Sequence, residues 1–303
     1  MYISSDFSRL EINLNGCLEN YRYFRSKLEA STKLLVLVKA NAYGHGAVQF
    51  ASLMEEAGAD YLAVAYPIEG IELRQAGIKS PIMVLTAGTD SFEQIINYGL
   101  EPGIPNMYSL RILCEVLQKR GMSDFPIHIK LDTGMTRIGL RYENVNEYKA
   151  EIEKICGFEN IKAEGIFTHL CVADSKSDDD ILYTKKQISL FNEIYSQIKD
   201  SCPQIVHHHY LNSAGGICHD EGKSTLARLG IILYGLKPDY ELDIPFEINP
   251  AMELKAVVSQ VKTVEAGAEI SYGRTFKADR EIKLATVSIG YADGVPRALS
   301  YKG

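Results

Sequence analysis

The chain repeats one unit: a short apolar run, a turn and then an amphipathic segment. The amphipathic segments carry apolar residues at three- and four-residue spacings, which is typical of helices. The apolar runs predict eight strands, at Leu34–Val38, Tyr61–Ala65, Pro81–Ala87, Glu101–Pro105, Ile127–Thr133, Ile161–Leu170, Gln204–Asn212 and Thr225–Gly230. Eight strands alternating with helices predict an α/β fold, a parallel (β/α)8 TIM-type barrel. An open doubly wound sheet has the same periodicity and remains an alternative.

Local signals set several of the predicted helix ends. Pro67 stands where the helix after the second strand should begin, and proline is favoured at the first helical position. Gly77 is placed to end that helix, because glycine tolerates the left-handed conformation of a helix C-cap. The acidic run Asp178–Asp180 is interpreted as a solvated helix start. Further helices are predicted over Met107–Arg120 and Ile181–Lys199.

After residue 243 the pattern changes to β structure without long helices. Met252–Val264 and Ile282–Ile289 are predicted as strands, with the turn residues Glu265–Gly267 between them. We therefore expect a barrel over residues 1–243 and the start of a C-terminal β domain over residues 244–303. Because so few strands leave sheet edges unpaired, we expect that another chain covers them or that the sequence is part of a longer protein.

Composition excludes several classes of protein. The formal net charge is −7 and no basic block is present, which argues against a nucleic-acid partner. No apolar stretch is long enough to span a membrane and no signal peptide is visible, so a cytoplasmic location is expected. The six cysteines are scattered singly, and the run His207–His209 alternates between strand faces, so no metal site is predicted.

The predicted strand ends carry the candidate chemistry. Lys39 follows Leu34–Val38, and a tight loop, Ala40–Gly46, comes next. Apolar surroundings favour a neutral amine, which is the form that makes a Schiff base with an aldehyde. The loops after the seventh and eighth strands, Asn212–Gly216 and Arg228–Ile231, have small residues that let backbone N–H groups reach a phosphate. The pattern predicts an aldehyde cofactor that also carries a phosphate.

The same residues belong to a series of motifs that closely resembles the bacterial alanine racemases, which are pyridoxal-5′-phosphate (PLP) enzymes. The motifs occur in the family's order between Ser8 and the last residues. They are Val38–Gly46, Lys130–Gly139, Thr168–Leu170, Asn212–Gly215, Arg228–Gly230, Ser271–Gly273 and Gly290–Gly294. The resemblance implies interconversion of L- and D-alanine, which supplies D-alanine for peptidoglycan.

The resemblance also implies a role for each matching residue. Moving the α-proton from one face of the substrate to the other needs two bases. These are implied to be Lys39 and Tyr272 of the partner subunit, in a homodimer with shared active sites. A free tyrosine has a pKa of about 10, so its action as a base needs help. The resemblance places His169 beside the tyrosine and Arg228 beside the histidine. Arg228 would also face the ring nitrogen of PLP and keep it unprotonated.

Further positions follow from the same motifs. Arg137 and Tyr291 are implied at the substrate, and Lys130 matches a lysine that some members carbamylate, which would pair with Arg137. The cofactor contacts implied are Lys39, Tyr43, Asn212, Ser213, Arg228, Gly230 and Ile231.

Alternatives to an alanine racemase share parts of this pattern. One is a serine racemase domain from a glycopeptide-resistance protein, and another is a PLP-binding barrel without turnover. A basic amino-acid decarboxylase is disfavoured because its cysteine–aspartate motif is missing. The family's β domain normally continues beyond Gly294 with a methionine–aspartate–glutamine motif and a tyrosine at the phosphate. We therefore expect a longer parent protein. In this chain the wall of the partner's site is incomplete, so the activity of the chain by itself stays open.

Overall fold

The structure is a computed structural model, and it describes residues 7–219, 224–239, 241, 242, 244 and 246–299. The chain divides into two compact units, one spanning Asn13–Ala251 and the other formed by Met1–Ile12 with Met252–Gly303. No helix among the described residues is long and apolar enough to cross a membrane. Each unit is described below by itself.

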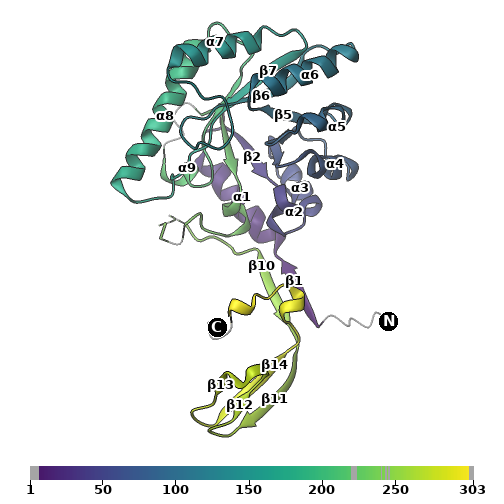
Figure 1. The fold of residues 1–303 in the computed structure, drawn as a ribbon, viewed down its shortest axis with the longest axis vertical. Coiled ribbons are helices and arrows are strands. Elements are labelled where there is room, and N and C mark those ends of the chain that lie inside the picture. The colour runs from purple at the N-terminus through teal and green to yellow at the C-terminus, as the bar shows by residue number, and fades with distance from the viewer. Residues whose placement is uncertain (1–6, 220–223, 240, 243, 245, 300–303) are drawn as a thin grey trace. The chain divides into compact units, whose positions relative to one another are not determined.

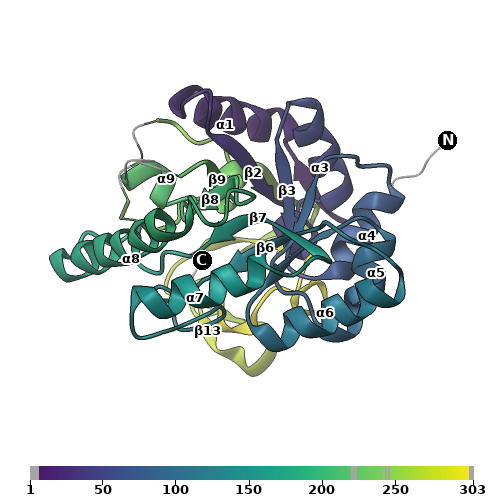
Figure 2. The ribbon, with the colours of Figure 1, turned by 90° about the horizontal axis from the view of Figure 1, so that it is seen from above.

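The larger unit is built on an eight-stranded parallel sheet in the order β8-β7-β6-β5-β4-β3-β2-β9 (Figures 1 and 2). The strands are β2 Lys33–Leu37, β3 Tyr61–Val64, β4 Ile82–Val84, β5 Glu101–Ile104, β6 Phe125–Lys130, β7 Ile161–Phe167, β8 His207–His209 and β9 Leu226–Leu229. The two strands at the ends of this order, β8 and β9, are joined by backbone hydrogen bonds. Thr225 N donates to His208 O at 2.9 Å, and Arg228 N donates to Leu211 O at 3.0 Å. The sheet is therefore a barrel, as the sequence predicts, and the open sheet is excluded.

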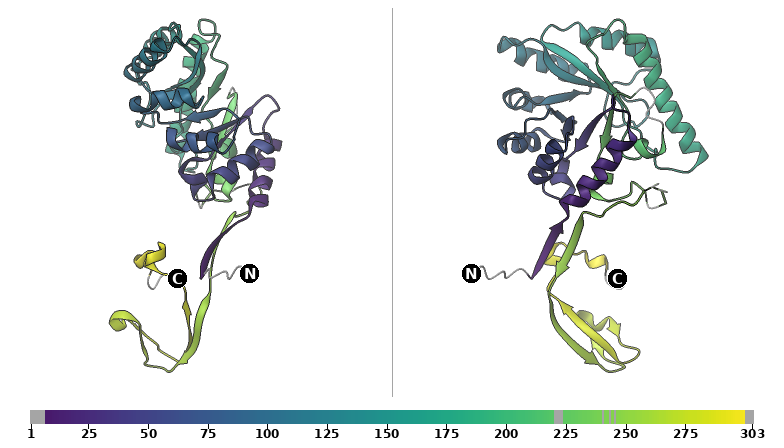
Figure 3. Two further views of the ribbon diagram at one scale, coloured as in Figure 1. Left: turned by 90° about the vertical axis from the view of Figure 1, so that its right-hand side faces the viewer. Right: turned by 180° about the vertical axis from the view of Figure 1, so that it is seen from behind.

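Helices cover the outside of the barrel, as Figure 2 and the two views of Figure 3 show. The longer helices are α1 Leu14–Lys27, α3 Ala47–Glu56, α4 Pro67–Gln75, α5 Phe92–Asn97, α6 Met107–Lys119, α7 Val145–Cys156 and α8 Asp178–Ile198. Short turns follow several strands, and they are α2 Lys39–Tyr43, α9 Gly215–Cys218 and the 3-10 helices η1 Thr89–Ser91 and η2 Ile231–Tyr234. The predicted starts at Pro67 and Asp178 are confirmed. Gly77 follows α4 with φ +96°, the left-handed conformation that ends it.

Two layers of side chains fill the barrel unit. Outward residues of the strands pack under the helices, because successive side chains of a strand point to opposite faces. On β8, for example, His208 points outward and stacks on Tyr195 of α8, with ring centres 3.8 Å apart. The inner layer is apolar around Leu35, Met83 and Phe167. It also contains several buried histidines, which are described below.

The smaller unit is β-rich, as expected for the C-terminal part of the chain. Strand β1, Ser8–Ile12, pairs antiparallel with β10, Met252–Ala256, so the N-terminal strand belongs to this unit (Figure 1). The remaining elements form two further antiparallel pairs and three short 3-10 helices. They are β11 Val258–Val264 with β14 Ile282–Val287, β12 Glu269–Ile270 with β13 Phe276–Lys277, and η3 Tyr272–Arg274, η4 Tyr291–Asp293 and η5 Arg297–Leu299.

Candidate active site

Lys39 begins α2, directly after β2, at the carboxyl end of the barrel. The next four residues all have left-handed backbone conformations, with φ between 51° and 54° at Ala40–Tyr43. Two side-chain acceptors hold this turn: Glu69 Oε1 accepts from Ala40 N at 2.6 Å, and Asn41 Oδ1 accepts from Ala47 N at 2.8 Å. The turn brings Lys39 Nζ to 5.8 Å from the centre of the Tyr43 ring. Lys39 is half-buried.

The loops after β8 and β9 meet beside this turn. Ser213 Oγ accepts a hydrogen bond from Gly230 N at 3.0 Å. A side chain at Gly230 would begin 3.1 Å from the hydroxyl of Tyr43, so the three segments approach one another closely there. Asn212 shapes the first loop, because its Oδ1 accepts from Gly215 N at 2.8 Å. The structure thus groups Tyr43, Ser213 and Gly230, and Ile231 starts the 3-10 helix that follows.

Arg228, on β9, points into the barrel and is 3% exposed. All its hydrogen bonds go to neutral acceptors: Nη2 donates to Thr168 O at 2.7 Å and to His169 Nδ1 at 3.3 Å, and Nη1 donates to His209 Nδ1 at 2.7 Å. Its Nε–H makes no hydrogen bond within the described part of the chain. Burial lowers the pKa of Arg228 to about 9, so the guanidinium is still a cation at neutral pH.

His169 is held as a neutral base beside that cation. Burial lowers its pKa well below the usual value, and the positive charges of Arg228 and Lys130 lower it further. Because Arg228 donates to Nδ1, the ring proton must be on Nε2. His169 therefore offers one N–H donor on its free side.

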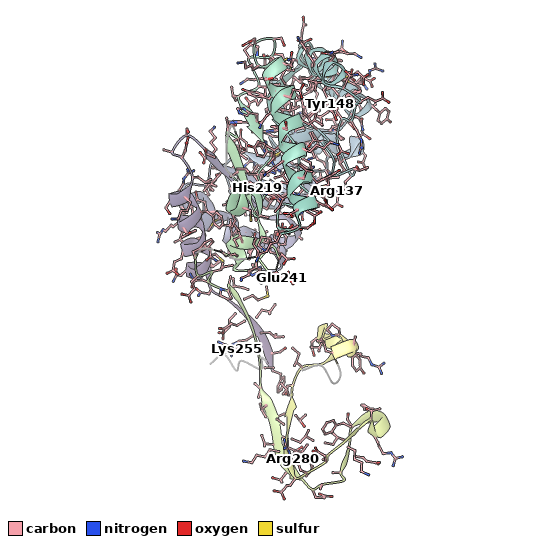
Figure 4. All side chains as sticks on the ribbon, turned by 90° about the vertical axis from the view of Figure 1, so that its left-hand side faces the viewer. Arg137, Tyr148, His219, Glu241, Lys255 and Arg280 are labelled. Atoms are coloured by element: carbon pink, nitrogen blue, oxygen red, sulfur yellow. The ribbon has the colours of Figure 1, made fainter. Side chains whose placement is uncertain are left out.

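Lys130 and Arg137 add two more basic groups on and after β6. Lys130 is 9% exposed, and its Nζ lies 4.5 Å from the centre of the Phe167 ring. Burial lowers the pKa of Lys130 well below its usual value, and Arg228 and Arg137 add to the effect. Arg137, labelled in Figure 4, is exposed on the loop that follows β6. It helps to line a hollow of about 580 Å³ at the ends of β4, β5 and β6.

Tyr272 and Tyr291 lie in the smaller unit, on η3 and η4. Their side chains are 97% and 77% exposed. The structure therefore brings together Lys39, Tyr43 and the residues around Arg228 within the barrel unit. It leaves these two tyrosines open to contact with another molecule.

Sequence reasoning missed His209, which the run His207–His209 concealed. This histidine is fully buried, accepts a hydrogen bond from Arg228 and stacks on Phe167 with ring centres 5.2 Å apart. Strand alternation was the available signal, since it places His209 on the inner face. Its contact with Arg228 depends on how β8 meets β9, which the sequence does not show.

The fold and the site define a class: a (β/α)8 barrel that carries a lysine, a neutral histidine and a buried arginine at the carboxyl ends of its strands, where barrel enzymes have their active sites. Residues 12–238 match the family described as "Alanine racemase, N-terminal domain", and residues 251–303 match "Alanine racemase, C-terminal domain". An alanine racemase from Nostoc sp. is 37% identical over 296 residues, which cover 97% of this chain and 75% of that protein.

Solved structures agree with the sequence comparison. Alanine racemase from Clostridium difficile 630 matches with a TM-score of 0.87 and 36% identity, over 97% of this chain and 76% of that one. The enzyme from Bartonella henselae, solved with covalently bound pyridoxal phosphate, matches with a TM-score of 0.82 and 28% identity, over 97% and 78%. The chain therefore belongs to the alanine racemase family, and it is an isomerase of the kind that interconverts L- and D-alanine.

Proposed function

We propose that Lys39 holds PLP covalently and that Arg228 faces the ring nitrogen of the cofactor. The observation that carries this proposal is the bonding of Arg228, whose partners are all neutral and whose Nε–H has no acceptor among the described residues. A pyridine nitrogen is a neutral acceptor that such a donor suits. The Bartonella henselae structure, with its covalently bound pyridoxal phosphate, supports the assignment of the cofactor.

The phosphate fits the place where Tyr43, Ser213 and Gly230 meet. A side chain at Gly230 would crowd the hydroxyl of Tyr43, so the absence of one keeps room for phosphate oxygens. The Ser213 and Tyr43 hydroxyls and the backbone N–H of Ile231 would serve as donors. Asn212 would act by holding the loop, since its Oδ1 bonds to Gly215 N.

PLP, when bound, supplies a conjugated ring that stabilises negative charge at the α-carbon of an amino acid. Arg228 weakens this effect, because it gives no proton to the ring nitrogen. A weaker electron sink would favour the return of a proton to the α-carbon over side reactions. Arg228 would thus favour racemisation over transamination.

Two bases move the proton. Lys39 Nζ would act on one face of the substrate, and Tyr272 of the partner subunit would act on the other. Because His169 is neutral with its proton on Nε2, it can donate a hydrogen bond to the tyrosine oxygen and stabilise the phenolate. The 97% exposure of Tyr272 in a single chain fits a residue that serves another subunit, so we propose a homodimer with shared sites.

The substrate carboxylate would be held by Arg137, with Tyr291 of the partner subunit near the entry. We propose that Lys130 is carbamylated, because its lowered pKa favours the neutral amine that adds carbon dioxide and releases a proton. The resulting anion would lie within the field of Arg137 and Arg228, the cations that now disfavour a charged lysine.

The test compares Lys39→Ala with Lys79→Ala, an exposed lysine used as a matched control. We expect wild type and Lys79→Ala to show the visible absorbance of lysine-bound PLP and to convert L-alanine into D-alanine. Lys39→Ala should show neither, while keeping the far-UV circular dichroism of the wild type. A folded Lys39→Ala variant that retained the absorbance band would overturn the assignment. Mass spectrometry of the intact wild-type protein after borohydride reduction would locate the cofactor on its lysine.

A further inference from the structure

A column of polar side chains runs through the core of the barrel beneath Arg228. His209 on β8 contacts Arg228, His128 on β6 lies next to His209, and Glu101 at the start of β5 contacts His128. His128 and His209 are both fully buried, and Glu101 is 12% exposed. Charged and polar groups are costly inside a barrel core unless they are paired, so this column needs an explanation.

The hydrogen bonds at its two ends fix where the protons lie. Arg228 Nη1 donates to His209 Nδ1 at 2.7 Å, so His209 must carry its proton on Nε2. At the other end His128 Nε2 lies 2.9 Å from Glu101 Oε2 and donates to it, which leaves Nδ1 as an acceptor when the ring carries a single proton. His209 therefore presents a donor, and His128 presents an acceptor.

Both of these complementary atoms lack a hydrogen-bond partner among the described residues. His209 Nε2 and His128 Nδ1 are buried and make no hydrogen bond within the described residues. The two ring centres are 6.1 Å apart, with the rings nearly perpendicular. Imidazole nitrogens lie about 1 Å from the ring centre, so the gap of roughly 4 Å or more suits one bridging water rather than a direct bond.

We propose that Glu101 and His128 are positioning residues for Arg228, linked to it by a one-way hydrogen-bond chain through His209 and a water. Every donor in the chain points from the guanidinium towards the carboxylate. The carboxylate sets the tautomer of His128, which favours a donor on His209 Nε2 and leaves His209 Nδ1 as the acceptor that holds Arg228. This inference rests on the role given to Arg228 in the proposed function.

The polypeptide backbone next to His128 leaves room for the imidazole ring. A side chain at Gly165 on β7 would begin 2.2 Å from His128 Nδ1, so only glycine leaves the imidazole in place. Phe167, an apolar residue of the inner layer, stacks on His209 and offers it no hydrogen-bond acceptor. A reversed tautomer of His209 would set an N–H against the Arg228 guanidinium, which has only donors.

The first test measures the tautomers directly, in PLP-free protein. Long-range ¹H–¹⁵N spectra of ¹⁵N-histidine-labelled protein distinguish a protonated from an unprotonated ring nitrogen. We expect both His128 and His209 as neutral Nε2–H tautomers. The control variant His208→Gln, which changes the outward face of the same strand, should leave both patterns as they are. A proton on His209 Nδ1, or a doubly protonated His128, overturns the proposal.

The second test breaks and restores the chain at His128. His128→Phe removes both hydrogen bonds, whereas the amide of His128→Gln keeps one donor for Glu101 and one acceptor for the water. We expect His128→Phe to shift the His209 ring signals and to lower kcat about tenfold, the effect of losing one hydrogen bond, with KM nearly unchanged. His128→Gln should restore both the signals and kcat. Equal kcat values in folded Phe and Gln variants would contradict the positioning role.

The two proposals fail in different ways. If the tautomers are as expected but no PLP absorbance develops, the hydrogen-bond chain is supported and the cofactor assignment is wrong. If PLP binds to Lys39 and alanine is racemised while His209 carries its proton on Nδ1, the cofactor assignment is supported and the hydrogen-bond chain is refuted.

Discussion

The left-handed turn after Lys39 predicts that a glycine substitution within it raises the free energy of unfolding. Ala40 has φ 52° and an exposed side chain. A non-glycine residue in this conformation costs about 1–2 kcal/mol, and glycine avoids that cost. Glycine also adds about 0.4–1 kcal/mol of entropy to the unfolded chain. Because Ala40 loses no packing when its methyl is removed, we expect Ala40→Gly to stabilise the barrel unit by roughly 0.5–1 kcal/mol.

A matched substitution in a right-handed helix should have the opposite sign. Ala150 is exposed in α7, and replacing it with glycine should destabilise the unit by about 1 kcal/mol. The free energy of unfolding would be measured by urea titration of the PLP-free proteins, followed by circular dichroism, with equal m-values as the check on two-state unfolding. If Ala40→Gly destabilises the unit as much as Ala150→Gly does, the turn is not left-handed, and the backbone conformation described after Lys39 is wrong.

Three further predictions concern the same unit. Gly230→Val should weaken PLP binding at least tenfold in an absorbance titration while leaving the fold intact, because its side chain would meet the Tyr43 hydroxyl. Gly235→Ala should prevent folding or lower the thermal midpoint sharply, since its Cβ would lie 2.1 Å from Asn249 O and φ is +80°. Stability should fall as the pH drops from 6.5 towards 4, because burial lowers the pKa of His207 to about 4 and the unfolded chain then binds the extra proton. That histidine alone accounts for about 3 kcal/mol across this range, and His207→Gln should flatten the urea-unfolding profile against pH by that amount.

The barrel was predictable because its signals are local. Pro67 and Asp178 begin helices in the structure as the sequence indicates, and each of the eight apolar runs overlaps one strand of the sheet. Strand lengths were less predictable. The run Gln204–Asn212 was expected as one strand, yet only His207–His209 pairs as β8. Apolar periodicity continues past the last paired residue, and so it does not mark where pairing stops.

The left-handed turn lay beyond sequence reasoning because long-range contacts impose it. Ala40, Asn41 and Ala42 carry no signal for positive φ apart from the mild preference of asparagine. The turn is held by Glu69, twenty-nine positions further along the chain, whose carboxylate accepts from Ala40 N. Glu69 occupies that position because α4 starts at Pro67. The sequence thus placed Lys39 at the end of a barrel strand but did not show the backbone conformation of the turn that follows it.

The charge around the site differs in sign from the net charge of the whole chain. The chain carries a net charge of −7, which alone suggests nothing about binding anions. At the carboxyl end of the barrel, however, burial lowers the pKa of His169, and the positive charges of Arg228, Arg137 and Lys39 lower it further. The carboxylate of Asp132 acts in the opposite direction on the pKa of Lys130. Such a site favours neutral bases and anionic ligands. In the proposed function a cofactor phosphate and a substrate carboxylate would supply the missing negative charge, which is one physical reason for proposing a phosphorylated aldehyde and an amino acid as the ligands of this barrel.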